Sequence, residues 1–253
     1  MIIPKPYVFI TGSPRSGTSM ITKIVDSHPD VGILMENVFG LRRRHWDFPD
    51  YWHNDEILFQ IVNETFSELI EPIVGNKVCV PDVWNTDEIM KMCSFFSSSK
   101  IIFMVRDPVS VVLSRQRRDN EDEYSNEAKK YLCFDWSDKK HTSISSWRQS
   151  VEVYWKLKES MKKNILLVYY DDFVNNFEFG VKEIFNFLDL PMNESVHSWH
   201  KLPHYDSEGN KVKDLKYKDK PVSDHKSNET LPEGIIDHLN GLIHYQLWKD
   251  RQI

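Results

Sequence analysis

The sequence predicts an α/β fold, in which a parallel β-sheet is flanked by helices. Three apolar runs, Tyr7–Thr11, Ile101–Val105 and Ile165–Tyr169, have the length and composition of buried strands. Each run is followed by a segment with the apolar spacing of a helix. This alternation of strand and helix is typical of a parallel sheet covered on both faces.

Shorter or weaker signals complete the predicted order of elements. The remaining predicted elements are the strands Val31–Leu34 and Val78–Val80, and the helices Thr18–Asp26, Ile57–Ile70, Thr86–Phe96 with Thr86 as N-cap, a helix opened by Pro108, Ser146–Lys162, Asn176–Leu188 and Leu231–Trp248. Asp119–Asp138 is predicted to be a loop or lid. Met192–Pro232 is predicted to be irregular. The 253 residues contain no repeat and no clear linker, so residues 1–253 are expected to form one domain.

Charge and composition restrict the class of function. The net charge is −6, from 32 basic and 38 acidic side chains, and a general nucleic-acid binder would show a basic surplus. Cys79, Cys93 and Cys133 are scattered without metal-ligand spacing, which predicts reduced thiols and no metal site. No apolar run approaches the ~18 residues of a membrane span, and the start is too short for a secretion signal. We therefore expect a cytoplasmic protein, with an oligomeric state that the sequence does not indicate.

The stretch FITGSPRSGTSM, residues 9–20, indicates a phosphate-binding loop. Gly12 and Gly17 have the spacing of the ATP-binding pattern G-x-x-x-x-G-K-[ST], but Thr18 occupies the lysine position. The backbone N–H groups of residues 14–19 and the start of the following helix can still bind one anion. Arg15 supplies the cation inside the loop. The loop therefore predicts binding of a single 5′-phosphate rather than a triphosphate; the alternative is an ordinary strand-to-helix turn.

A second candidate anion site lies in FMVRDPVSVVLSRQRR, residues 103–118. Arg106 ends a predicted strand, and Ser114 falls eight residues later, two turns into the helix that Pro108 opens. An arginine and a hydroxyl on rigid elements could bind a second phosphate. Taken alone, the segment is equally compatible with a strand–helix connection that carries a surface arginine.

Together these stretches resemble the sulfotransferase superfamily that uses 3′-phosphoadenosine 5′-phosphosulfate (PAPS). In that family a P-[KR]-[ST]-G-T-[ST] loop binds the 5′-phosphosulfate and an R-x₇-S pair binds the 3′-phosphate; Val168–Phe173 is similar to a third family segment. The resemblance implies the P-loop-like sulfotransferase fold, metal-independent transfer, and release of 3′,5′-adenosine bisphosphate (PAP). The cofactor-binding residues that it implies are Pro14, Arg15, Ser16, Gly17, Thr18, Ser19, Arg106, Ser114 and Tyr170, with Lys226 and Ser227 in a late loop.

Glu36 is the candidate general base. It follows the predicted strand Val31–Leu34 and so would emerge at the same sheet edge as the loop. Its distance from the loop is similar to that in the tyrosylprotein branch, where the equivalent glutamate is the base. The alternatives are a solvated carboxylate at this position or a histidine base. Related enzymes carry a lysine in a K-x-P context, but Val78–Asp82 is apolar at that position, which leaves Arg15 as the candidate cation; Lys77 lies close in sequence.

Arginines and aromatic residues of the segment Leu41–Asp55 suggest an acceptor pocket. The candidate acceptor-binding residues are Arg42, Trp46, Trp52, His53 and Trp84. The alternative is an irregular surface segment, with Trp84 in the core. A small-molecule, sugar or lipid hydroxyl is expected as the acceptor. Two rival functions remain: an ATP-dependent small-molecule kinase that needs Mg²⁺, and a nucleotide-binding relative without catalytic activity.

Overall fold

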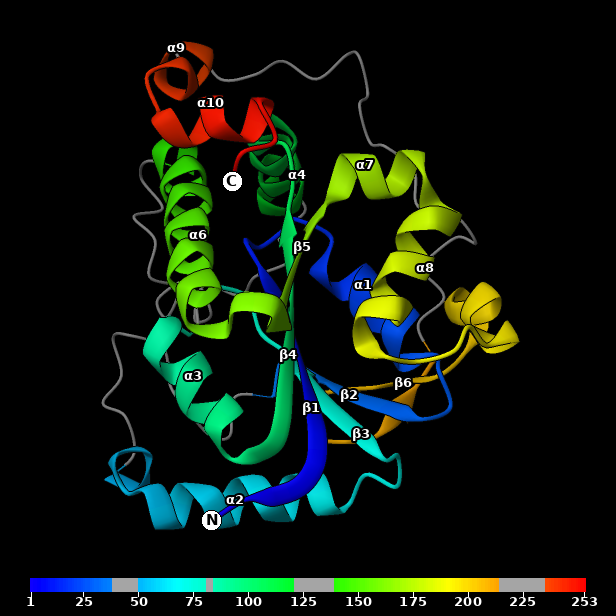
Figure 1. Ribbon diagram of the computed structural model, residues 1–253. Coiled ribbons are helices and arrows are strands. Elements are labelled where there is room, and N and C mark those ends of the chain that lie inside the picture. The colour runs from blue at the N-terminus through cyan, green and yellow to red at the C-terminus, as the bar shows by residue number, and fades with distance from the viewer. Residues whose placement is uncertain (38–49, 81–83, 121–138, 214–234) are drawn as a thin grey trace.

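The computed structural model describes residues 1–37, 50–80, 84–120, 139–213 and 235–253. Within these residues the main sheet has the strand order β2-β3-β1-β4-β5, and all of its neighbouring strands are parallel (Figure 1). The strands are β1 (Ile3–Gly12), β2 (Val31–Met35), β3 (Ile73–Lys77), β4 (Phe96–Val105) and β5 (Ile165–Tyr169). The predicted parallel α/β fold is confirmed. The single-domain organisation stays a prediction.

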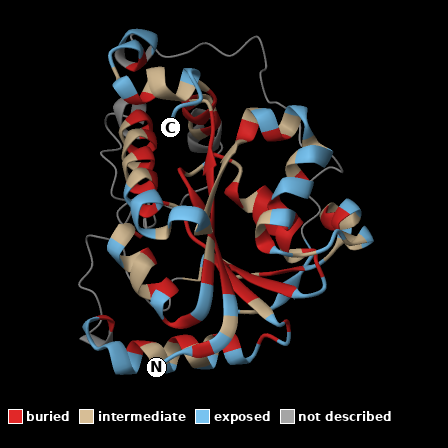
Figure 2. Ribbon diagram, in the orientation of Figure 1, coloured by how far each residue is buried: buried red, intermediate tan, exposed pale blue. Residues whose placement is uncertain are grey.

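Helices cover both faces of the sheet, and a hydrophobic cluster fills the space on each side. One face carries α1 (Thr18–Asp26), α7 (Tyr170–Asn175) and α8 (Phe177–Leu188), and the other carries α2 (Asp55–Ser67), α3 (Thr86–Ser94) and α6 (Lys139–Met161). Alternate residues of β1 divide between the clusters: Val8 and Ile10 face α1, whereas Tyr7 and Phe9 face the other side. Strands β1 to β4 are therefore buried along most of their length, whereas every residue of the edge strand β5 is half-buried (Figure 2).

Some predicted elements differ from the structure. The expected strand Val78–Val80 is wrong, because β3 ends at Lys77; Val78 and Val80 still donate their N–H groups to Ile10 and Gly12 of β1. The predicted helix Asn176–Leu188 corresponds to α8, and the sequence analysis did not predict the short helix α7 that precedes it. The closing helix is divided into α9 (Ile235–Asn240) and α10 (Ile243–Lys249).

The N-cap of α3 is Asn85, not Thr86. The Asn85 side chain accepts the N–H groups of Asp87 and Glu88, and the Glu88 carboxylate accepts the Asn85 N–H in return. This reciprocal capping box satisfies amides that the helix itself leaves unpaired. The predicted lid Asp119–Asp138 lies outside the described residues, apart from its first two positions, which end α4 (Pro108–Asn120).

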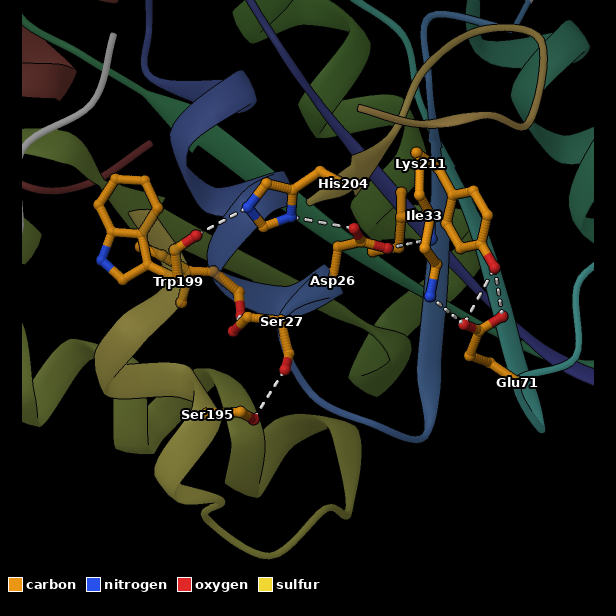
Figure 3. Close-up of polar contacts among 10 residues, drawn as sticks. Asp26, Ser27, Ile33, Glu71, Ser195, Trp199, His204 and Lys211 are labelled. Atoms are coloured by element: carbon orange, nitrogen blue, oxygen red, sulfur yellow. Dashed lines mark hydrogen bonds and ion pairs between the residues drawn. The ribbon is translucent and has the colours of Figure 1, made fainter. Parts of the chain in front are cut away.

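Residues 192–213 are more ordered than the sequence suggested. They contain a 3₁₀ helix, η4 (Glu194–Lys201), and a hairpin of β6 (His204–Tyr205) and β7 (Lys211–Val212). The hairpin lies beside β2, the edge strand. Glu71 accepts the Tyr205 hydroxyl and the Lys211 ammonium, each at 3.0 Å, and this contact attaches the hairpin to the sheet (Figure 3).

The outer edge of β2 is closed by hydrogen bonds from different parts of the chain. Each of its outward N–H groups donates a hydrogen bond. The Val31 N–H donates to His28 O, the Ile33 N–H to Asp26 Oδ1, and the Met35 N–H to Asp206 O. The other Asp26 oxygen lies 3.0 Å from His204 Nδ1, and His204 Nε2 lies 2.7 Å from the Trp199 carbonyl (Figure 3). Asp26 therefore links α1, β2 and the hairpin.

None of the helices within the described ranges is both long and apolar enough to cross a membrane.

Candidate active site

The carboxyl ends of the five parallel strands bring the predicted site residues to one edge of the sheet. Ligands of open α/β sheets bind at this edge. From the strand ends emerge the loop 13–17 after β1, Glu36 after β2, Lys77 at the end of β3, Arg106 after β4 and Tyr170 after β5.

The loop after β1 has the backbone of an anion cradle. Arg15 and Gly17 have φ of 72° and 93°, and the Ser16 hydroxyl donates to Ser13 O at 2.5 Å, which closes the turn. Gly12 is required because a Cβ there would lie 2.3 Å from the Met104 carbonyl oxygen. Gly17 is the N-cap of α1 and gives it no side-chain cap; the Met20 N–H donates to Gly17 O, and the N–H groups of Thr18 and Ser19 in the same turn are suited to an anion.

The two predicted anion sites are in direct contact. Arg15 Nε donates to Ser114 Oγ at 3.0 Å, and Arg106 Nη1 donates to the Arg15 carbonyl at 3.1 Å. Arg15 is exposed, whereas Arg106 and Ser114 are buried. Among the other loop residues of the prediction, Ser16 and Thr18 are buried, and Pro14, Gly17 and Ser19 are half-buried.

Arg106 is a buried cation with unused hydrogen-bonding capacity. Its Nε has no hydrogen-bond partner in the described part of the chain, and no described carboxylate pairs with it. The Trp147 indole N–H donates to Arg106 O at 2.9 Å and fixes its backbone. Because an unsatisfied buried N–H is costly, this guanidinium is suited to an anionic ligand.

Tyr170 packs between the loop and Arg106. The Arg106 guanidinium carbon lies 4.3 Å from the centre of the Tyr170 ring. A Cβ on Gly17 would lie 2.5 Å from the same ring, so the ring rests directly on the glycine. Tyr170 thus joins the end of β5 to both anion-binding segments.

Glu36 and Lys77 form an ion pair at the ends of β2 and β3. Lys77 Nζ lies 2.5 Å from Glu36 Oε1; the lysine side chain is 2% exposed and the glutamate side chain 61%. Burial alone would lower the Lys77 pKa, but the neighbouring Cys79 and Glu36 side chains outweigh it and raise the pKa above its usual value. Thr18 Oγ1 lies 3.7 Å from Cys79 Sγ, so this cluster reaches the anion loop.

Lys77 is the site residue that the sequence analysis did not select. Its position as the last residue of a buried strand was the available signal, and the incorrect strand boundary concealed it. The histidines considered as rival bases are His53, His197, His200 and His204. His204 is held by Asp26 and Trp199 O, and the exposed His197 lies 3.7 Å from Glu178.

The predicted acceptor residues do not gather into a pocket in the described structure. Trp52 and Trp84 are buried in the cluster on the α2 and α3 side, where Trp84 stacks on Phe9 with ring centres 5.4 Å apart. This matches the core alternative for Trp84. His53 is exposed at the end of the 3₁₀ helix η1 (Asp50–His53). Arg42, Trp46, Lys226 and Ser227 lie outside the described residues.

No group of three or more His, Cys, Asp or Glu side chains in the described ranges could hold a metal ion.

Comparison with known proteins gives one consistent family. The model of the family described as "Sulfotransferase family" matches residues 6–194. Protein-tyrosine sulfotransferase A of Caenorhabditis elegans is 25% identical over 209 residues, which are 76% of this chain and 52% of that protein. The protein-tyrosine sulfotransferase of Drosophila melanogaster is 27% identical over 211 residues, 76% of this chain and 39% of that protein. The chain spans about half the length of these curated relatives.

Solved structures share the fold. The sulfotransferase domain from the curacin biosynthetic pathway superposes with a TM-score of 0.62 at 13% identity, covering 99% of this chain and 98% of that chain. Mouse sulfotransferase SULT7A1 complexed with PAP gives a TM-score of 0.52 at 14% identity, covering 100% and 84%. The predicted P-loop-like sulfotransferase fold is confirmed.

One expectation about partners is wrong. We expected a small-molecule, sugar or lipid hydroxyl as the acceptor, but the similar curated proteins are named as protein-tyrosine sulfotransferases. The expectation came from the absence of an apolar span, and that property says nothing about the acceptor.

Proposed function

The chain belongs to the sulfotransferase family, and we propose that it transfers the sulfuryl group of PAPS to the hydroxyl of a protein tyrosine. The observation that carries the proposal is the contact between the two anion-binding segments: Arg15 bonds to Ser114, and Arg106 bonds to Arg15. This contact places the two candidate phosphate-binding sites next to each other at one edge of the sheet. Neither the kinase nor the inactive relative is favoured by the comparisons.

The donor fits the residues present. The Arg15 guanidinium and the N–H groups around Gly17 would bind the 5′-phosphosulfate, and Arg106 with Ser114 would bind the 3′-phosphate. The unsatisfied buried Nε of Arg106 supports this assignment. Tyr170 would lie beside the adenosine. The mouse neighbour in complex with PAP supports a donor of this class.

PAPS supplies a sulfuryl group whose leaving group is a phosphate. In the proposed reaction Glu36 accepts the tyrosine hydroxyl proton while the tyrosine oxygen forms a bond to sulfur. The sulfur–oxygen bond to the phosphate breaks, and its electron pair stays on the phosphate oxygen. Lys77 and Arg15 stabilise that negative charge, and the raised pKa of Lys77 keeps its ammonium charged. The products are a tyrosine sulfate ester and PAP.

A base is needed because a tyrosine phenol has a pKa of about 10 and is neutral at physiological pH. Glu36 is mostly exposed and so can be reached by an acceptor side chain. The ion pair with Lys77 gives its carboxylate a fixed position next to the cation that would balance the leaving charge. The relatives named for protein tyrosine support a tyrosine acceptor.

The test is transfer of radiolabelled sulfate from PAPS to a tyrosine-containing peptide, with the phenylalanine version of that peptide as control. We expect transfer to the tyrosine peptide alone, and we expect Glu36→Gln to lower kcat by about 100-fold or more while the Kd for PAP is unchanged. Tight PAP binding with no transfer to any tyrosine peptide would contradict the proposal. A higher affinity for ATP than for PAP would instead support the ATP-dependent kinase.

A further inference from the structure

Glu36 lies in a backbone conformation that its own side chain does not favour. Its φ is 62°, in the left-handed region that glycine and, less often, asparagine adopt. A non-glycine residue remains there only when its surroundings hold it. The contacts of residues 35–37 therefore determine where the Glu36 carboxylate lies.

Two neighbours hold this turn from opposite sides. On the outer side lies the β6–β7 hairpin. The Met35 backbone N–H donates to Asp206 O at 3.3 Å, and the Asn37 side-chain Nδ2 donates to Ser207 O at 2.8 Å. On the inner side lies β3, where the Glu36 backbone N–H donates to Lys77 O at 2.8 Å.

The inner side also contributes a side chain. The Asn76 Nδ2 group donates to the Asn37 carbonyl at 2.6 Å, directly after Glu36. Asn76 and Lys77 are consecutive residues of β3, so their side chains leave opposite faces of the strand. One of them contacts the backbone of the turn, and the other contacts its carboxylate.

Asn76 is an unusual residue for its place in the sheet. It is fully buried in β3, opposite Phe9 of β1 and Leu34 of β2. Asparagine is depleted in strands, and a buried amide is costly unless it is fully hydrogen-bonded. Its Oδ1 has no partner within the described part of the chain. An apolar β-branched residue would suit the strand better, so packing does not explain the amide.

We propose that Asn76 is a positioning residue for sulfuryl transfer, which holds the left-handed turn and thereby directs the Glu36 carboxylate to Lys77. The proposal rests on the proposed function and adds to it a residue that touches neither donor nor acceptor. It predicts that loss of the Nδ2 donor impairs only the step that uses Glu36.

The experiment is a double-mutant cycle of Asn76→Val and Glu36→Gln, with kcat for transfer to the tyrosine peptide and the Kd for PAP measured for each protein. We expect Asn76→Val alone to lower kcat by about 10- to 100-fold, with the Kd for PAP within about twofold of wild type. In the Glu36→Gln background we expect the same substitution to change the residual rate by less than about twofold, because the group that it positions is absent.

Ser99→Ala is the matched control. It removes another buried side-chain bond to a carbonyl, Ser99 Oγ to Cys93 O at 2.8 Å, in β4 away from the carboxyl edge. We expect it to leave kcat unchanged. If Asn76→Val does not fold, Asn76→Ser replaces it, since serine is smaller and too short to reach the Asn37 carbonyl.

The outcomes are distinguishable. Equal rate losses from Asn76→Val in both backgrounds, or a loss confined to the Kd for PAP, would overturn the positioning role and leave the proposed function intact. No transfer by the wild-type protein would overturn both.

Discussion

Replacement of Gly17 by alanine should damage the donor site more than any ordinary glycine substitution. The alanine Cβ would lie 2.5 Å and 2.7 Å from two Tyr170 ring carbons, and the backbone has a φ of 93°. Tyr170 is buried, and the Arg106 guanidinium packs over its ring at 4.3 Å, so the ring cannot move without disturbing the second anion site.

The cost has two parts. The left-handed backbone costs alanine about 1–2 kcal/mol, and forced displacement of a packed ring costs about 1–3 kcal/mol more. We therefore expect Gly17→Ala to lower the free energy of unfolding by about 2–5 kcal/mol, a large share of a usual total of about 5–15 kcal/mol. The Kd for PAP should rise at least about tenfold. Strain of about 1.4 kcal/mol in the binding conformation of the loop already lowers the affinity by a factor of ten.

Gly209→Ala is the control that isolates the backbone part of this destabilisation from the part caused by displacing the ring. Gly209 has a similar φ of 86°, but an added Cβ there meets no atom within 4 Å. Urea unfolding of this variant should show only the backbone part, about 1–2 kcal/mol, and calorimetry should show unchanged PAP binding. If Gly17→Ala is no more destabilising than Gly209→Ala, the inferred contact between the loop and Tyr170 is incorrect.

Three further predictions follow from single groups. Arg106→Ala should weaken PAP binding by about 10- to 100-fold in calorimetry, whereas Arg251→Ala, which also removes one positive charge, should not; equal losses would indicate a nonspecific charge effect. The pKa of Glu71 is lowered, because hydrogen bonds and the nearby Lys211 outweigh its burial. The stability difference between wild type and Glu71→Gln should therefore be present at neutral pH and diminish as the pH falls below about 4.5; a difference that persists in urea unfolding at low pH would contradict this. Burial raises the pKa of Cys93 to about 12, so mass spectrometry should show alkylation of the half-buried Cys79 before that of Cys93, and PAP should slow the Cys79 reaction; labelling unaffected by PAP would place Cys79 away from the donor.

The sequence was sufficient where local signals coincide. Helix α1 begins and ends at the predicted residues, because Gly17 precedes it and the Ser27–Asp30 turn follows it. The family resemblance also assigned Arg15, Ser114 and Arg106 to one bound donor, which implies that these three residues lie near one another. The mutual hydrogen bonds of these residues could not be derived, because they depend on contacts between segments about 90 residues apart.

Lys77 and the hairpin were missed for physical reasons. Gly75 and Asn76 interrupt the apolar pattern of β3, so the apolar run Val78–Val80 was chosen instead. The hairpin strands have two residues each and carry no periodicity of their own. Contacts with Glu71, more than 130 residues away in the chain, stabilise them.

The closed edge of β2 limits how other polypeptides can associate with this molecule. Because its three outward amides are occupied, β2 offers no template for an added strand, and an acceptor polypeptide cannot extend the sheet on this side. The same bonds protect a strongly apolar strand from edge-to-edge aggregation. The Asp26 carboxylate is one of these protecting groups, and Ile33 is fully buried, so a variant without the carboxylate would leave the Ile33 N–H buried without a partner and would destabilise this edge of the sheet.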